Sequence, residues 1–262
     1  MPARQLSSEL AASSGVRVSR QTVYRRLRAG GLCARRPAVC VQLTRVHIRN
    51  RLQWSRQHKH WTLDEWRNVL FTDKSRLSLI NDFRRTIIWR ERGTRFHPTK
   101  ILGKLPFCGG GVLVQAGIMF NGREDLHIFA AGNVNAQRYR DEVLERHVQL
   151  FRGVVGPHFI FMDDNARLHR ANLVDEYHEG EDIRRMDWPA MSPDLNAIEH
   201  AWGALGRRVA AHQPPSRTLS TLRNALRQEW KQLPAELLNH LIEGMPRCYD
   251  ACVAMRGNHF PY

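Results

Sequence analysis

Residues 158–165 have the sequence HFIFMDDN, and this short segment indicates the architecture of the chain. The apolar run from Phe159 to Met162 predicts a strand that is buried in the interior of a sheet. Asp163 and Asp164 follow at once, so the strand delivers two carboxylates from an apolar core to a polar edge. This pattern is typical of an α/β fold whose functional side chains lie at the carboxyl end of the sheet.

Other apolar segments predict further strands of the same sheet. They are residues 69–73, 76–80, 86–90, 112–120, 126–129 and 183–188. Asn121-Gly122 joins the fourth and the fifth of these, and it is a turn sequence typical of a β-hairpin. The sheet is therefore expected to begin with antiparallel strands.

Helices are predicted where apolar residues recur at helical spacing. The segments are residues 44–60, 135–151, 168–178, 193–210, 218–231 and 234–254. Pro193 is placed in the first turn of its helix, where proline is tolerated. Helices thus alternate with strands in the second half of the sequence.

The composition favours a nucleic-acid partner. The chain has 262 residues, and 40 Lys and Arg residues against 25 Asp and Glu residues give a net charge of +15. Such a charge favours binding to a large polyanion, and a solvated basic surface is the alternative. Five cysteines without a CxxC pair indicate neither a disulfide framework nor a zinc ribbon. No apolar run approaches the roughly 20 residues of a membrane span, so a soluble protein that is not secreted is expected.

A helix–turn–helix pattern occupies the start of the chain. Residues 7–14 form the first helical segment, Gly15 and Val16 the turn, and Ser19 caps the second segment. A basic extended linker follows Gly30-Gly31. We predict contacts with phosphates and base edges in a major groove from Arg20, Gln21, Thr22, Arg25, Arg26 and Arg28. Arg35 and Arg36 of the linker are predicted to lie in a minor groove or along the DNA backbone. A basic surface helix and a flexible connector are the alternatives for these two segments.

Three acidic residues form the candidate catalytic cluster. Asp73 and Asp164 end buried strands, and Glu199 lies on a predicted helix. Carboxylates at adjacent strand ends suit hard cations, which prefer oxygen ligands. Two Mg²⁺ or Mn²⁺ ions held roughly 3.5 to 4 Å apart could activate an attacking oxygen and stabilise a leaving oxygen at phosphorus. Taken singly, each acid could instead be a turn residue or a first-turn helix acid.

Three sequence blocks resemble the signature blocks of the mariner-superfamily transposases, on the Tc branch. They are FTDKS at 71–75, MDDNARLH at 162–169 and WPAMSPDLNAIEHAW at 188–202. Between Asp164 and Glu199 lie 34 residues, an interval that resembles the spacing in the Tc branch. Asn165 follows the ligand in this family, which places the ligand at Asp164 and turns Asp163 to the opposite face. His169 resembles the family's histidine and is expected to touch DNA, to lie behind the metal ligands, or to lie on the surface.

The resemblance implies an RNase H-like catalytic domain, a mixed sheet flanked by helices, preceded by a partial helix–turn–helix segment. We expect a DNA-binding segment at 1–32, a basic linker and helix at 33–66 and the catalytic domain at 67–262. The catalytic and metal-binding residues would be Asp73, Asp164 and Glu199, with two Mg²⁺ or Mn²⁺ ions. The implied function is cut-and-paste DNA transposition, in which strand cleavage at transposon ends is followed by strand transfer.

The implied partner is double-stranded DNA, both the inverted repeats of a transposon and its target. A homodimer would suit the pairing of two transposon ends, no membrane is involved, and the expected location is the nucleus. Family members carry two helix–turn–helix modules, whereas this chain starts within the second, so an N-terminally truncated copy is expected. Lys74 replaces a common acid, Asp163 a common glutamine and Leu168 a common proline.

Two other functions remain open from the sequence. The first is a catalytically inactive, transposase-derived DNA-binding protein, whose binding would not respond to substitution of the three acids. The second is a structure-selective or RNA-directed nuclease with the same fold, because a fold does not fix a function. Metal dependence distinguishes the first from a transposase, and cleavage of an RNA–DNA hybrid distinguishes the second.

Overall fold

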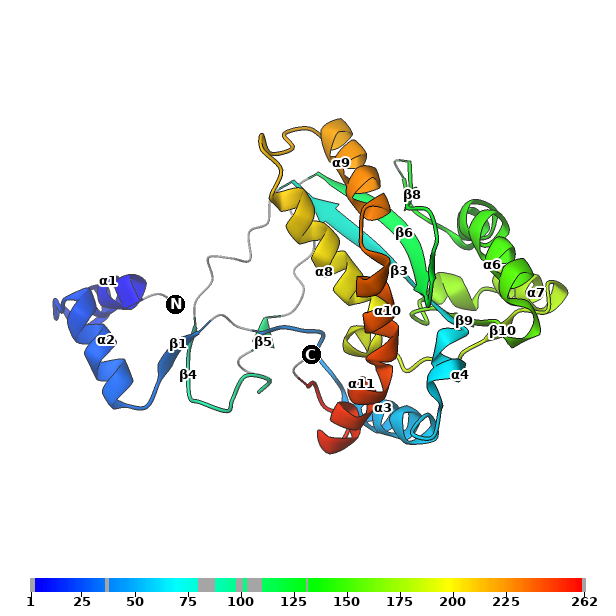
Figure 1. Ribbon diagram of the computed structural model, residues 1–262. Helices are drawn as coiled ribbons and strands as arrows, with labels where there is room; N and C mark the ends of the chain where they lie inside the picture. The colour runs from blue at the N-terminus through cyan, green and yellow to red at the C-terminus, as the bar shows by residue number, and fades with distance from the viewer. Residues whose placement is uncertain are drawn as a thin grey trace. The chain divides into compact units, whose positions relative to one another are not determined.

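The computed structural model describes residues 3–35, 38–79, 88–97, 101–102, 110–130 and 132–260. The chain divides into two compact units (Figure 1). The smaller unit comprises Met1–Gln42 and Ile80–Cys108, and the larger unit comprises Leu43–Leu79 and Gly109–Tyr262. The candidate catalytic residues therefore all lie in the larger unit.

The smaller unit contains the predicted helix–turn–helix. Its helices are α1 (Ala3–Ser14) and α2 (Arg20–Ala29). Ser19 caps α2, and its side chain accepts a hydrogen bond of 3.1 Å from the backbone N–H of Thr22. The cap fixes the start of the helix at the residue that the sequence pattern predicts.

Short strands complete the smaller unit. β1 (Cys33–Arg35) pairs antiparallel with β4 (Ile88–Arg90), and β2 (Ala38–Val39) pairs parallel with β5 (Ile101–Leu102). β4 covers the second part of the strand predicted at 86–90, and residues 86 and 87 lie outside the described residues.

Among the described residues, the larger unit is built on a six-stranded mixed sheet. Its strands are β3 (Val69–Ser78), β6 (Gly111–Met119), β7 (Gly122–Arg123), β8 (His127–Ile128), β9 (Ile160–Met162) and β10 (Arg184–Arg185). Their order is β10-β9-β3-β6-β7, and β8 also pairs with β6. β3 is antiparallel to β6 and parallel to β9, so the central strand carries both kinds of pairing. The predicted hairpin and antiparallel start are confirmed.

Both faces of this sheet are buried. Val69, Phe71 and Met162 belong to one apolar core, whereas Leu70 and Phe161 belong to a second core on the other side. Successive side chains of a strand point to opposite faces, so a strand with a core on each side needs a continuous apolar run. This explains why Val69–Phe71 and Phe159–Met162, shortly before Asp73 and Asp164, are apolar at every position.

Helices cover the two faces (Figure 1). The first core lies under helices whose residues pack against β3 and β6, namely α3 (Arg45–Gln57), α4 (Leu63–Arg67), α8 (Ala197–Ala210), α9 (Leu219–Lys231), α10 (Ala235–Glu243) and α11 (Met245–Ala254). The second core lies under α5 (Ala136–Tyr139), the π-helical segment Arg140–Val148, α6 (Gln149–Val155) and α7 (Asn172–Gly180). The architecture is the predicted α/β fold with a mixed sheet between helices.

Three predicted helices are each divided in the structure. The segment 168–178 consists of a 3₁₀ turn, Arg167–Arg170, and then α7, because Ala171 has an extended backbone. The segment 193–210 consists of a 3₁₀ turn, Pro193–Leu195, and then α8, because Asn196 has an extended backbone and caps α8. The segment 234–254 consists of α10 and α11, which meet at Gly244. Pro246 explains this break, because a proline within a continuous helix would clash with the carbonyl of Ile242 four residues earlier.

A buried ion pair ties α3 to the loop before α8. The Arg51 guanidinium is fully buried and donates to both carboxylate oxygens of Asp194, at 2.5 and 2.6 Å. Its Nε donates to the carbonyl oxygen of Gly257 at 2.8 Å. α3 thus packs within the larger unit, and the functional boundaries expected at 32/33 and 66/67 stay a prediction. In the described part of the chain, no helix has the length and apolar character to cross a bilayer.

Candidate active site

The register of two parallel strands brings Asp73 and Asp164 to the same edge of the sheet. Phe71 of β3 is level with Met162 of β9; Asp73 follows two residues after Phe71 on β3, and Asp164 follows two residues after Met162, on the loop after β9. Because side chains alternate along a strand, Asp73 continues the face occupied by Phe71, which is the face that α8 covers.

Helix α8 reaches this edge through Trp202. The indole N–H of Trp202 donates to Oδ2 of Asp73 at 3.1 Å, and its ring stacks on Trp230 with centroids 5.1 Å apart. Glu199 lies one helical turn before Trp202 and is half-buried. The side-chain amide of Asn196, at the cap of α8, donates to the carbonyl of Thr72 at 3.2 Å. Two contacts therefore hold the helix that carries Glu199 against the strand that carries Asp73.

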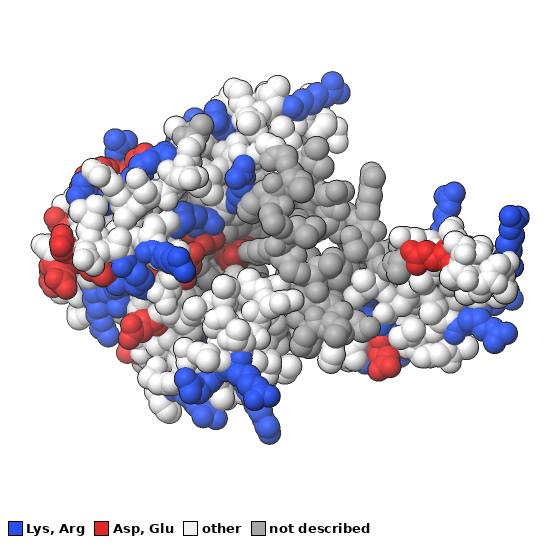
Figure 2. All heavy atoms as spheres, turned by 180° about the vertical axis from the view of Figure 1, so that it is seen from behind, with Lys and Arg blue, Asp and Glu red and all other residues white. Residues whose placement is uncertain are grey.

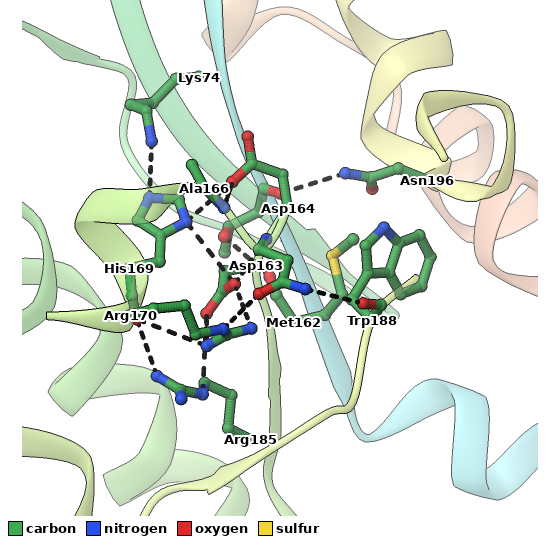
Figure 3. Close-up of polar contacts among 12 residues, drawn as sticks. Lys74, Met162, Asp163, Asp164, Ala166, His169, Arg170, Arg185, Trp188 and Asn196 are labelled. Atoms are coloured by element: carbon green, nitrogen blue, oxygen red, sulfur yellow. Dashed lines mark hydrogen bonds and ion pairs between the residues drawn. The ribbon is translucent and has the colours of Figure 1, made fainter. Parts of the chain in front are cut away.

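Asp164 is held by its own loop. Its Oδ1 accepts a hydrogen bond of 3.0 Å from the backbone N–H of Ala166 and lies 2.8 Å from Nδ1 of His169 (Figure 3). The side chain keeps 37% of its surface exposed. Burial by itself would raise the pKa of this carboxyl, but His169 and Lys74 outweigh burial and hold the pKa well below its usual range. The carboxylate is therefore ionised at neutral pH.

Asp163 has a different environment and a structural role. It is fully buried, and its Oδ1 accepts from Arg170 Nη2 at 3.0 Å and from the backbone N–H of Asn165 at 2.9 Å (Figure 3). His169 and Arg170 lower the pKa of this carboxyl more than burial raises it. Because its charge is already compensated by arginine, Asp163 is less suited than Asp164 to receive a cation, and the assignment of the ligand to Asp164 stays a prediction.

The three predicted acids do not form a compact group of ligand atoms in the structure. Among the described residues, one group of three metal-ligating side chains has its donor atoms within 4.8 Å of one another, and it consists of Asp163, Asp164 and His169. Asp73 and Glu199 are not members of this group. The structure thus places the three predicted acids on β3, on the loop after β9 and on α8, and their role as a common ligand set stays a prediction.

The predicted DNA-binding side chains lie in the smaller unit. Arg20, Gln21, Thr22, Arg25, Arg26 and Arg28 are exposed on α2, and Arg35 is exposed at the end of β1. Arg36 lies outside the described residues. On the face drawn in Figure 2, basic side chains project from both units. A set of exposed arginines on the second helix of a helix–turn–helix is suited to phosphates and base edges.

The sequence does not determine the surroundings of two residues of the site, His169 and Lys74. His169 is 2% exposed, which rules out the surface alternative and places it behind Asp164. The sequence shows Lys74 only as the residue that follows Asp73 and replaces a common acid. In the structure its Nζ lies 2.6 Å from His169 Nε2. The alternation along β3 was the available signal, because Lys74 must point to the face opposite Asp73.

The donor set fits a divalent metal ion. Carboxylate oxygens at strand ends are ligands that Mg²⁺ and Mn²⁺ prefer, and Asp164 is ionised and half-exposed. An α/β sheet with such an acidic edge, together with a helix–turn–helix, defines a metal-dependent nuclease that acts on DNA.

Comparison with known families identifies this nuclease more closely. Residues 68–223 match the family described as "DDE superfamily endonuclease", and residues 1–60 match a helix–turn–helix family described as "Transposase". The first match covers more than half of the chain and includes all three predicted acids. The chain belongs to the DDE superfamily endonuclease family, whose catalytic domain uses divalent metal ions.

Individual relatives agree with this assignment. The chain is 29% identical over 240 residues to the Tcb2 transposase of Caenorhabditis briggsae, covering 91% of this chain and 86% of that protein. The pre-cleavage Mos1 transpososome has the same fold, with a TM-score of 0.69, 20% identity and coverage of 100% and 76% of the two chains. The Mos1 mariner paired-end complex with Mn is similar, with a TM-score of 0.67, 20% identity and the same coverage.

Proposed function

We propose that this protein is a cut-and-paste DNA transposase that cleaves and joins DNA strands at transposon ends. Asp73, Asp164 and Glu199 would hold two Mg²⁺ or Mn²⁺ ions. The observation that carries the proposal is the parallel register of β3 and β9, which aligns Asp73 with Asp164 at the edge that α8 covers. The similarity to Tcb2 and to the metal-containing Mos1 complex supports it.

The side chains of the site have separate tasks. Trp202 orients the Asp73 carboxylate by donating its indole N–H to Oδ2. The Ala166 N–H and His169 orient Asp164 through Oδ1, which directs Oδ2 away from them. When bound, divalent ions supply an activated nucleophilic oxygen and stabilise the charge that develops on the leaving oxygen of a phosphodiester.

The proposal includes the partners of the reaction. The exposed arginines of α2 would bind the inverted repeats, since phosphate contacts position a protein on DNA and base-edge contacts specify the sequence. Two copies of the chain would pair the two transposon ends. In a eukaryotic host the protein would act in the nucleus, where its DNA substrate lies.

Substitution of Asp164 by asparagine is expected to abolish metal-dependent nicking of supercoiled plasmid DNA. The amide keeps the size of the side chain but removes the negative charge that a divalent cation requires. The measurement compares nicking by the parent and by Asp164→Asn at low salt, with Mn²⁺ or Mg²⁺ and with EDTA. Equal nicking by both proteins would contradict the assignment of Asp164.

DNA binding and the choice of substrate distinguish a transposase from the two other functions considered. DNA binding by Asp164→Asn should match that of the parent, because the arginines of α2 belong to the smaller unit. Binding without nicking by either protein would favour the inactive DNA-binding protein. Preferential cleavage of an RNA–DNA hybrid over duplex DNA would favour the RNA-directed nuclease.

Trp202→Phe is expected to slow nicking roughly tenfold, because the Asp73 carboxylate loses a hydrogen bond to a charged group. Phenylalanine keeps an aromatic ring against Trp230. The matched control is Trp230→Phe, which removes the other indole of the stacked pair and its 2.8 Å bond to the carbonyl of Glu124. Both variants should lose similar stability in thermal melts, and only Trp202→Phe should lose nicking rate. Equal rates for the two variants would argue against an orienting role.

A further inference from the structure

Lys74 is a half-buried basic residue that points into the catalytic unit. It follows Asp73 on β3, so its side chain points to the opposite face of the sheet. Its Nζ lies 2.6 Å from Nε2 of His169 (Figure 3). The same atom lies 5.2 Å from the centroid of the Tyr139 ring. The ammonium group is thus directed toward the loop that carries Asp164, and not toward solvent.

His169 connects Lys74 to Asp164. A lysine side chain has only donors, so Nε2 of the imidazole accepts from Lys74 and the ring proton lies on Nδ1. Nδ1 is the atom that lies 2.8 Å from Oδ1 of Asp164. The imidazole also packs against Tyr139, with ring centroids 4.3 Å apart, which restricts its rotation. Lys74, His169 and Asp164 therefore form a row of polar contacts in which the positive charge is at one end and the carboxylate at the other.

Several carboxylates lie close enough to Lys74 to interact with its positive charge. Asp163 has Arg170 as its own partner. Burial lowers the pKa of Lys74, and the carboxylates of Asp164, Asp73 and Asp163, with which its positive charge interacts, oppose that shift in part. Any cation that binds these carboxylates must do so in the presence of the ammonium group.

We propose that Lys74 is an internal counter-cation of the metal site: through His169 it holds Asp164 in place, and by repulsion it weakens the binding of divalent ions. The inference rests on the metal site proposed above. It assigns Lys74 and His169 as positioning residues and makes Lys74 a determinant of metal affinity. The contacts among Lys74, His169 and Asp164 set the orientation of Asp164 before an ion binds. The positive charge of Lys74 then repels the ion and weakens its binding.

The expected size of the effect follows from Coulomb's law. The interposed imidazole ring keeps the ammonium group beyond direct contact with Asp164, and the site is half-open to water. Under these conditions, removing a single positive charge is expected to strengthen the binding of a divalent ion roughly tenfold.

The test is Mn²⁺ binding by the full chain, measured by isothermal titration calorimetry without DNA. Lys74→Gln should lower the Kd for Mn²⁺ about tenfold, because glutamine has no charge. Lys74→Arg should leave the Kd near that of the parent, because the charge is kept. Lys231→Gln, at an exposed lysine on α9, is the control for a change in net charge and should also leave the Kd unchanged.

The outcomes separate this inference from the proposed function. A Kd of Lys74→Gln that equals or exceeds that of the parent overturns the inference, and so does equal tightening by Lys231→Gln. Thermal melts establish that each variant is folded, and Lys74→Met provides a second uncharged variant. If Asp164→Asn removes Mn²⁺ binding and Lys74→Gln tightens it while no protein nicks DNA, the proposed activity fails and the inference stands. If neither the parent nor Lys74→Gln binds Mn²⁺, the metal site itself is refuted and the inference falls with it.

Discussion

Arg51→Ala is expected to lower the free energy of unfolding of the catalytic unit by about 3–5 kcal/mol. Arg51 is 0% exposed and makes two parallel hydrogen bonds to Asp194. Removing the guanidinium leaves the Asp194 carboxylate buried, with His259 Nδ1 at 3.6 Å as its nearest remaining basic partner among the described side chains. A buried charge without its counterion costs several kcal/mol, which is a large part of the stability of a typical domain.

The same substitution should loosen the C-terminal segment. Nε of Arg51 donates to the carbonyl of Gly257, where the chain passes directly over α3. Gly257 has φ of +82°, and a Cβ at this position would lie 2.1 Å from the carbonyl oxygen of Ile48. Only glycine permits so close an approach, so the bond from Arg51 lies at a point where the backbones are in contact.

The measurement is urea unfolding followed by tryptophan fluorescence. Arg56→Ala is the matched control, since Arg56 is exposed on the same helix and its removal should change the stability by less than about 0.5 kcal/mol. Arg51→Lys should fall between the two, because lysine keeps the charge but not the planar pair of donors. If Arg51→Ala unfolds at the same urea concentration as Arg56→Ala, the ion pair does not stabilise the fold.

The strands and helices of the site could be predicted because their signals are local. The apolar runs before Asp73 and Asp164 predict strands with a core on both faces, and each run ends where the charged residues begin. The segment around Glu199 has helical spacing and a proline near its start. The adjacency of the two strands does not follow from either run alone. The expectation of adjacent strand ends rests on the acids that follow the two runs, and the parallel pairing of β3 with β9 agrees with it.

The buried ion pair could not be predicted, because nothing local distinguishes its members. Arg51 is one of several arginines on α3, and the others include Arg49 and Arg56. Asp194 has the sequence position of an ordinary first-turn acid after Pro193. Their partnership joins residues that are 143 positions apart and depends on packing that periodicity does not report.

His169 illustrates the same limit within the active site. Its sequence position leaves a surface role and a role behind the metal ligands equally open. The decision depends on Lys74 and Tyr139, which pack against opposite parts of the imidazole from elements far away in the sequence. Side-chain burial of this kind is set by the tertiary fold, whereas the order of strands and helices is set largely by the local pattern.

Glu124→Gln is expected to stabilise the protein at alkaline pH and to remove a pH dependence of its stability. Glu124 is 3% exposed, and Oε1 has no hydrogen-bond partner in the described part of the chain. The carboxyl packs against Gly117, where a Cβ would lie 2.9 Å from Oε2. Burial raises the pKa of this carboxyl from 4.5 to about 8. Glutamine has a similar shape and cannot ionise.

The sign follows from the two protonation states. Below pH 4.5, which is the ordinary pKa of a glutamate, the folded and the unfolded chain both carry the proton and no stability is lost. As the pH rises toward the folded pKa of about 8, the unfolded chain releases the proton while the folded chain retains it, so stability falls. The relation of about 1.4 kcal/mol per pH unit gives an upper bound of about 5 kcal/mol for the total loss. Above the folded pKa the loss is complete.

The difference in unfolding free energy between the parent and Glu124→Gln isolates this carboxyl from other titrating groups. Urea unfolding at about pH 5 should give similar values for the two proteins, and at about pH 8.5 the variant should be the more stable by several kcal/mol. Glu179→Gln, at an exposed glutamate on α7, should follow the parent at both pH values. The difference in unfolding free energy between the parent and Glu124→Gln could instead stay constant across this pH range. That result would mean that Glu124 is ionised in the folded protein, with its charge balanced by water within the apolar core. In that case the unpaired carboxyl would be hydrated and would cost the fold little.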